Sequence, residues 1–100
     1  MSDSRVDEPI SVVCARTKNF GLPITGYLSA TAFDEHLQCL VGVVYGESRG
    51  RFRDGAWIRT SPVERQWEHE CYSLFRTFNG STYVVCDWLA QDLGPRFTRH

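Results

Sequence analysis

The chain has 100 residues, of which 42% are hydrophobic and 13% aromatic, enough for one compact domain and too few for two. Its formal net charge of −1 at pH 7 argues against a general polyanion binder, because affinity for nucleic acid depends largely on cationic side chains. The sequence has no recognisable signal peptide and no apolar run near the roughly 20 residues that cross a bilayer, so we predict a soluble, cytoplasmic protein.

The chain begins with a predicted tail, a strand and a loop. Residues 1–9 are polar and acidic, which indicates a disordered tail. Residues 10–14 are rich in β-branched side chains and predict a strand. The glycines and the proline in residues 18–26 then predict a loop.

The best helix candidate follows at residues 29–40. Ser29 or Thr31 can cap its N-terminus, and the acidic residues Asp34 and Glu35 fall in the first turns, where the helix dipole favours them. Apolar side chains recur at helical spacings of four and three. The recurring residues are Phe33, Leu37 and Leu40. We therefore predict one short amphipathic helix here.

The second half of the chain predicts β-structure. Residues 41–45 and 56–61 are apolar or β-branched and indicate two strands, separated by a glycine- and arginine-rich turn at residues 47–55. Residues 65–70 are polar apart from Trp67 and are predicted to be a loop before a final hairpin.

The final hairpin is predicted by Asn79 and Gly80, which stand between two β-rich runs. A two-residue type I′ turn needs positive φ at both central positions, and these residue types tolerate it. A loop of these two residues places Phe75 opposite Val84 and gives both faces apolar side chains. We therefore predict a central hairpin that is covered on both sides.

The element order β-α-β-β-β-β predicts a single α+β domain over residues 10–94. Its sheet is predicted to be mostly antiparallel, with about five strands and one short helix packed on it, and curling into a small barrel is one form such a sheet can take. Residues 95–100 are predicted to be a flexible C-terminal tail.

The four cysteines show neither a disulfide nor a metal pattern. Cys14, Cys39, Cys71 and Cys86 lie in apolar settings without a Cys-x-x-Cys pair, which predicts buried free thiols. In the predicted hairpin Cys71 and Cys86 are diagonal neighbours, about 7 to 8 Å apart at Cα and beyond the usual span of a disulfide. A zinc site that adds His69 to these two lacks a convincing fourth ligand, so we predict no metal and no cofactor.

The sequence also lacks the common catalytic motifs. It contains no Gly-x-x-x-x-Gly-Lys phosphate loop, no Gly-x-Ser-x-Gly elbow, no His-Glu-x-x-His pair and no dinucleotide-binding glycine pattern. A spacing of two would place His69 and Cys71 on one face if the segment were a strand, and likewise Glu68 and Glu70, but no third catalytic group accompanies either pair. We therefore predict that the protein is not an enzyme.

Arginine and aromatic residues in the middle of the chain form a candidate binding surface. Arginine suits bidentate pairing with carboxylate or phosphate, and Trp67, set among charged residues, suits a protein-binding hot spot. The candidate residues are Arg49, Arg51, Phe52, Arg53, Arg59, Arg65 and Trp67. The alternatives are that the arginines are solvated charges with Glu47 and Asp54 as local partners, and that Trp67 folds back over apolar surface.

Two motifs carry a family resemblance. The pattern GRFxxGxWIRTSP at residues 50–62 and the pattern TxNxxxYVV at residues 77–85 resemble a family of small bacterial and prophage-associated domains of unknown function. The matching elements run over residues 43–85, and the chain departs from the family in its longer loop at residues 65–70. The resemblance implies a mobile-element origin and function through binding, without a specific activity.

These observations predict a non-catalytic, protein-binding module. We expect a phage- or prophage-encoded accessory protein that binds and modulates a host protein, with a component of a defence system such as CRISPR as one such partner. The alternative is a small nucleic-acid-binding barrel in which residues 49–53 contact phosphates while Phe52, Trp57 or Tyr83 stacks on bases. A homodimer is a further possibility, and no membrane partner is predicted.

Overall fold

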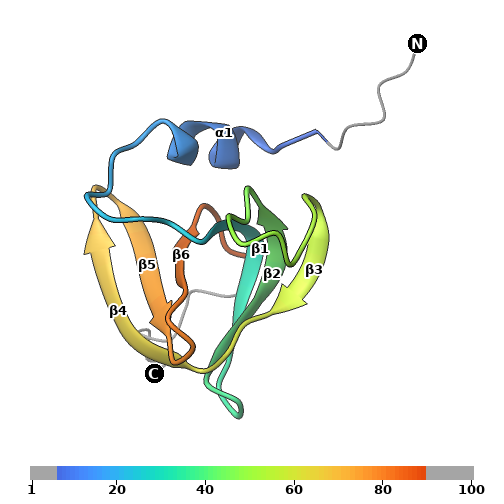
Figure 1. The fold of residues 1–100 in the computed structure, drawn as a ribbon, viewed down its shortest axis with the longest axis vertical. Helices are drawn as coiled ribbons and strands as arrows, with labels where there is room; N and C mark the ends of the chain where they lie inside the picture. The colour runs from blue at the N-terminus through green and yellow to red at the C-terminus, as the bar shows by residue number, and fades with distance from the viewer. Residues whose placement is uncertain (1–6, 90–100) are drawn as a thin grey trace.

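The computed structural model describes residues 7–89 of the protein. In chain order the elements are α1 (Ile10–Arg16), β1 (Gly26–Asp34), β2 (Cys39–Tyr45), β3 (Ala56–Arg59), β4 (Val63–His69), β5 (Tyr72–Thr77) and β6 (Thr82–Val85). The strands form one sheet in the order β3-β2-β1-β6-β5-β4. The predicted class, an α+β domain with a short helix on a mostly antiparallel sheet, is confirmed. The sheet curls, but its end strands β3 and β4 do not pair, so it is not closed into a barrel (Figure 1).

The sheet consists of two antiparallel, three-stranded halves that meet along one parallel pair of strands. One half is β1 to β3, the other is β4 to β6, and β1 and β6 form the seam between them. At the seam Gly26 lies opposite Tyr83 and Leu28 lies opposite Val85. A Cβ atom on Gly26 would stand 3.1 Å from Val44 and 3.2 Å from Tyr83, so a larger residue would displace these side chains.

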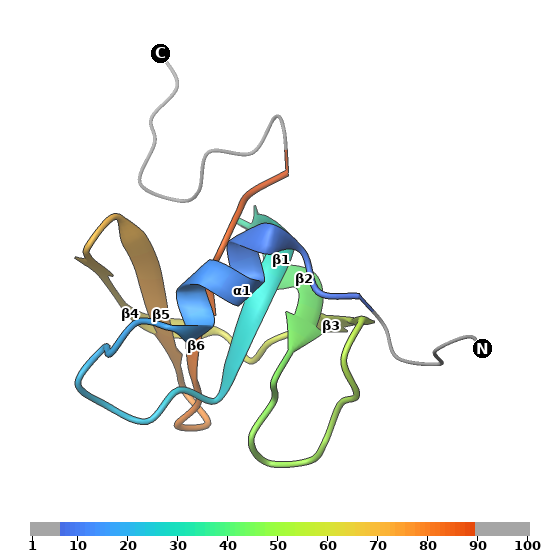
Figure 2. The ribbon, with the colours of Figure 1, turned by 90° about the horizontal axis from the view of Figure 1, so that it is seen from above.

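Two hydrophobic clusters stabilise the two faces of this curled sheet. The inner cluster contains Leu28, Leu40, Val44, Ile58, Phe75, Tyr83 and Val85. The outer cluster contains Ala15, Phe20, Leu74 and Val84. Ala15 belongs to α1, and Figures 1 and 2 show this helix next to β1 and β6, the two middle strands of the sheet. Burial of apolar residues on both faces of β5 and β6, which are central strands, confirms the predicted character of the final hairpin.

The first predicted strand is wrong, because residues 10–14 belong to α1. Pro9 precedes the helix, and its carbonyl accepts the N–H of Val12 at 3.0 Å. Val12 and Ala15, three positions apart, are fully buried, as one face of a helix requires. The helix spans only seven residues, too few turns for a helical period to stand out from a short apolar run.

The predicted helix at residues 29–40 is also wrong, because this segment forms most of the β1–β2 hairpin. Asp34, expected in the first turn of the helix, instead accepts the backbone N–H of His36 at 2.9 Å and caps the turn between the strands. Phe33 and Leu40, whose spacing suggested a helix, lie opposite each other on the two strands.

A β-bulge in β1 connects the sheet to the helix and to the segment after β6. Ala30 has a φ of 51°, and the pairing with β2 shifts register between Ser29 and Ala32. The Asp87 carboxylate accepts the Ala30 N–H at 2.7 Å and also the hydroxyl groups of Ser29 and Ser11. This carboxylate therefore holds α1 and the chain after β6 against β1.

The β5–β6 hairpin turns at the predicted place but in a different register. Thr77 and Ser81 face each other across a three-residue loop, with the Thr77 N–H donating to the Ser81 carbonyl at 2.9 Å. Gly80 has a φ of 87° and is the one loop residue with positive φ, whereas a type I′ turn needs two. Phe75 consequently lies opposite Tyr83, one residue away from the predicted pairing.

The predicted loop at residues 65–70 is wrong, because β4 occupies most of it and pairs with β5. The connection to β5 is the two-residue turn Glu70-Cys71, whose φ angles are 50° and 73°. The type I′ geometry predicted for the final hairpin is therefore found one hairpin earlier, on two residues that adopt positive φ at a cost.

The strands predicted at residues 41–45 and 56–61 are confirmed as β2 and β3. Most of the predicted N-terminal tail and all of the predicted C-terminal tail, residues 95–100, lie outside the described residues.

Candidate functional site

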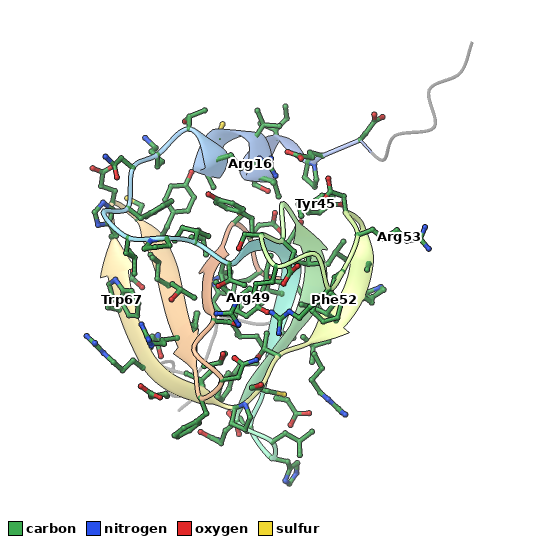
Figure 3. The ribbon with its side chains drawn as sticks, in the orientation of Figure 1. Arg16, Tyr45, Arg49, Phe52, Arg53 and Trp67 are labelled. Atoms are coloured by element: carbon green, nitrogen blue, oxygen red, sulfur yellow. The ribbon has the colours of Figure 1, made fainter. Side chains whose placement is uncertain are left out.

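Four of the candidate surface residues belong to the β2–β3 loop, residues 46–55, and they point in different directions. Figure 3 shows Arg49 and Phe52 in front of the curled sheet, whereas Arg53 points away from the molecule. Phe52 packs against the inner cluster. The loop therefore contributes to the fold as well as to the surface.

Arg51 forms an ion pair within this loop. Its backbone N–H and its Nε donate to the Glu47 carboxylate at 2.8 and 2.9 Å, and the Glu47 side chain is 0% exposed. Burial alone would raise the pKa of Glu47, but the hydrogen bonds and the charge of Arg51 outweigh burial and lower this pKa below its ordinary value of 4.5. Nη2 of Arg51 also lies 3.4 Å from the Tyr83 hydroxyl, so the guanidinium contacts β6 as well.

Arg49 connects the same loop to the β5–β6 hairpin. Its Nη1 lies 3.2 Å from the Ser81 hydroxyl, and its Nη2 donates to the Gly80 carbonyl at 3.1 Å. Arg49 and Arg51 thus hold the loop against the fold. Of the two acidic residues expected as local partners of the arginines, Glu47 pairs with Arg51, while Asp54 accepts a backbone N–H.

The exposed residues on and just before β3 form a separate group. We call Arg53, Trp57 and Arg59 the β3 surface. Trp57 is 61% exposed and Arg59 is exposed, whereas Ile58 between them is buried in the inner cluster. Val43 of β2 lies opposite Trp57 and is half-buried, which extends the apolar part of this surface onto the next strand.

The backbone of β3 also has an open side. The Thr60 N–H donates to the Leu40 carbonyl at 2.9 Å, which makes this an inward, hydrogen-bonded position of the antiparallel pair. Because such positions alternate, the N–H and C=O groups of Trp57 and Arg59 point away from β2. β3 is an end strand among the described residues, so these groups are placed to pair with an added strand.

Arg65 and Trp67 lie on β4, at the other edge of the sheet. Trp67 is half-buried and packs against the outer cluster, and the Arg65 guanidinium lies 5.3 Å from the centre of its ring. Figure 3 shows Trp67 and Arg53 on opposite sides of the molecule. Trp67 therefore covers apolar surface, as the alternative interpretation predicted, and the structure does not bring it together with the arginine loop.

All four cysteines are free thiols, and their burial differs from the prediction. Cys39 is buried and Cys86 is half-buried, but Cys14 and Cys71 are exposed, so the predicted burial is wrong for these two. Burial raises the pKa of the Cys86 thiol to about 12, and the charge of Asp87 adds to this shift. Within residues 7–89 the structure has no group of three or more His, Cys, Asp and Glu side chains placed to hold a metal ion.

Trp57 is the main surface residue that the candidate set did not contain. The sequence carries a signal for it, because in a strand Trp57 and Ile58 must point to opposite faces. The sequence does not reveal that β3 is an end strand, and this position leaves the outward tryptophan uncovered.

Comparison with protein-family models, with characterised proteins and with solved structures finds no match for this chain. The resemblance to prophage-associated domains therefore stays a prediction. In the part of the chain that the structure describes, no helix has the length and apolar character needed to cross a membrane.

Proposed function

We propose that the protein is a non-catalytic binding module that docks an extended, acidic segment of a partner protein against the open edge of β3. The observation that carries this proposal is the 61% exposure of Trp57 on an end strand whose outward backbone groups pair with no other strand of residues 7–89. Tryptophan and arginine are the residues most enriched at the centres of protein interfaces, and the β3 surface has one tryptophan and two arginines.

Each part of the β3 surface supplies a different contribution to such a complex. Backbone hydrogen bonds to Trp57 and Arg59 give affinity that depends little on the partner's sequence. The Trp57 ring buries a large apolar area at a low cost in side-chain entropy. Arg53 and Arg59 favour carboxylates in the incoming segment, since guanidinium groups pair with them bidentately.

In biological terms we propose that the partner is a host protein and that the module is a phage or prophage accessory factor that modulates it. This proposal follows from the resemblance to small prophage-associated domains that residues 43–85 predict, and for which no family model gives support. A protein component of a nucleic-acid-directed defence system is one partner class that fits such a role.

The test compares two aromatic residues of similar exposure. A partner isolated with the wild-type chain is titrated against Trp57→Ala and against Phe78→Ala, whose wild-type ring is 67% exposed at the tip of the β5–β6 hairpin. We expect Trp57→Ala to weaken binding by about 30-fold, a loss of about 2 kcal/mol, and Phe78→Ala to leave it unchanged. Equal affinities for wild type and Trp57→Ala would overturn the proposal.

A second pair of variants tests the mode of docking. Arg59→Pro removes an outward N–H as well as the side chain, whereas Arg59→Ala removes the side chain alone, and proline is tolerated on the open side of an edge strand. We expect Arg59→Pro to bind about tenfold more weakly than Arg59→Ala if a strand is added there. Tight binding of single- or double-stranded nucleic acid that weakens steeply with salt would instead favour the nucleic-acid alternative.

A further inference from the structure

A cavity of about 360 Å³ lies where the loop before β1, the β2–β3 loop and the tip of the β5–β6 hairpin meet. Figure 2 shows these three segments at the same end of the sheet. The volume lies within the range of about 300 to 1,000 Å³ that is usual for small-molecule sites. The cavity is separate from the β3 surface, because none of the three residues of that surface lines it.

The lining of this cavity is cationic. Two arginines, Arg49 and Arg76, contribute to it, and no acidic residue does. The hydroxyl-bearing residues Ser48, Thr25 and Thr82 also line it, and the apolar residues 22–24 complete the lining on another side. Since Thr25 Oγ1 accepts the Thr82 N–H at 3.0 Å, the proton of the Thr25 hydroxyl is left to donate elsewhere.

A half-buried cation is usually paired with a carboxylate or with hydrogen-bond acceptors, and within residues 7–89 Arg76 is not paired in this way. No acidic side chain or hydrogen-bond acceptor among the described residues pairs with its guanidinium. Its cross-strand neighbour on β4 is another cation, Arg65, and like charges placed directly opposite each other in a sheet are destabilising. An anion beside Arg76 would relieve this repulsion.

Arg49 is already held in position for such an anion. The Gly80 carbonyl and the Ser81 hydroxyl engage one N–H on each of its terminal nitrogens. A guanidinium carries five N–H donors, so three are left for a ligand. Because the side chain is fixed before binding, a ligand loses little affinity to ordering it.

We propose that this cavity binds a small phosphorylated molecule, with its phosphate between Arg49 and Arg76 and its organic part against the apolar wall of residues 22–24. Two guanidinium groups match a phosphate dianion in charge and in hydrogen-bond geometry. The apolar wall and the volume of the cavity favour a phosphate ester over inorganic phosphate. This site is independent of the proposed docking of a protein on β3.

The experiment follows backbone amide signals of the isotope-labelled full chain during titration with adenosine monophosphate, inorganic phosphate or adenosine. We expect saturable shifts at Thr25, Ser48 and Gly80 with the nucleotide, weaker binding of inorganic phosphate, and no binding of adenosine. Affinity for phosphate equal to that for the nucleotide would overturn the role of the apolar wall. The absence of any saturable response up to on the order of 10 mM nucleotide at low salt would overturn the site itself.

Two matched variants separate a built site from general charge attraction. Arg76→Gln is expected to weaken nucleotide binding by at least about tenfold while keeping or raising thermal stability, because it removes the repulsion with Arg65. Arg53→Gln makes the same charge change outside the cavity and is expected to leave the affinity for the nucleotide unchanged. Equal losses in the two variants would show non-specific attraction and overturn the proposal.

Discussion

The two end strands of the sheet, β3 and β4, both lack a second neighbour among the described residues, yet they expose different side chains. β4 has seven residues, most of them charged or polar, and its tryptophan lies over the outer cluster beneath the Arg65 guanidinium. β3 has four residues and leaves Trp57 61% exposed.

This difference bears on which edge the proposed partner would use. Charged residues along an edge strand discourage pairing with other chains, and β4 carries Glu64, Arg65 and Glu68. β3 has the protection of being short, but it exposes Trp57 and Arg59, and Arg53 is exposed in the loop just before it. The longer edge is therefore the better protected one, and binding is expected at the shorter edge.

The largest difference in stability between the two edges is expected when each tryptophan is replaced in turn. Trp67→Ala is expected to lower the free energy of unfolding by about 2 kcal/mol. This is less than for a fully buried tryptophan, because a half-buried ring contributes only part of its apolar area to the core. Trp57→Ala should change the free energy of unfolding by no more than about 0.5 kcal/mol. Urea denaturation at pH 7 measures both variants, and similar losses would show that Trp57 also serves the fold.

The next effect concerns the loop that positions β3. Arg51→Gln leaves the buried Glu47 carboxylate without its cation and should cost about 1 to 2 kcal/mol at pH 7. This is less than for a fully buried pair, because the Arg51 side chain is 35% exposed and partly screened by water. Arg53→Gln, the exposed control in the same loop, should change the free energy of unfolding by no more than about 0.5 kcal/mol.

The same pair predicts a dependence on pH. Folding lowers the pKa of Glu47 below 4.5, so its contribution to stability is complete above pH 4.5 and is lost as the pH falls through the lower, folded-state value. The unfolding curves of wild type and Arg51→Gln should therefore converge in acid. A stability difference that stays constant down to pH 2 would contradict this assignment.

The smallest effect is expected at the turn that ends β4. Glu70 and Cys71 both hold positive φ, so replacing them together by Asn and Gly should raise the free energy of unfolding by about 1 kcal/mol. Asn79→Gly is a useful contrast, because positive φ in that loop falls on Gly80 and not on Asn79. A gain of similar size from Asn79→Gly would show that the two turns do not differ as described.

The sequence predicted the elements whose signals are local and strong. The β-branched runs of β2 and β3 and the apolar residues on both faces of the final hairpin identified strands correctly. β4 was missed because an exposed edge strand carries little apolar alternation to recognise. The exchange of helix and strand in the first forty residues arose because Phe33 and Leu40 have a spacing that suits a helical face and a hairpin pair alike.

The candidate site was predictable only where partners are close in sequence. Glu47 and Arg51 are four residues apart and could be recognised as a pair. The contacts of Arg49 with Gly80 and Ser81 join distant segments, so no local pattern predicts that this arginine is held against the fold. The exposure of Trp57 likewise depends on strand order, which is a property of the whole sheet.

We expect the parallel pairing of β1 with β6 to form late in folding. Each three-stranded half pairs strands that are neighbours along the chain, whereas the β1–β6 pair joins segments from opposite ends of the domain and so carries the larger cost in loop closure. β3 belongs to the half of the sheet that is synthesised first. The loop before it, however, is anchored through Arg49 by Gly80 and Ser81, which belong to the half that is synthesised last. In a partly folded chain we therefore expect β3 to lack its anchored loop, so the surface proposed for docking would be complete only when the two halves have joined.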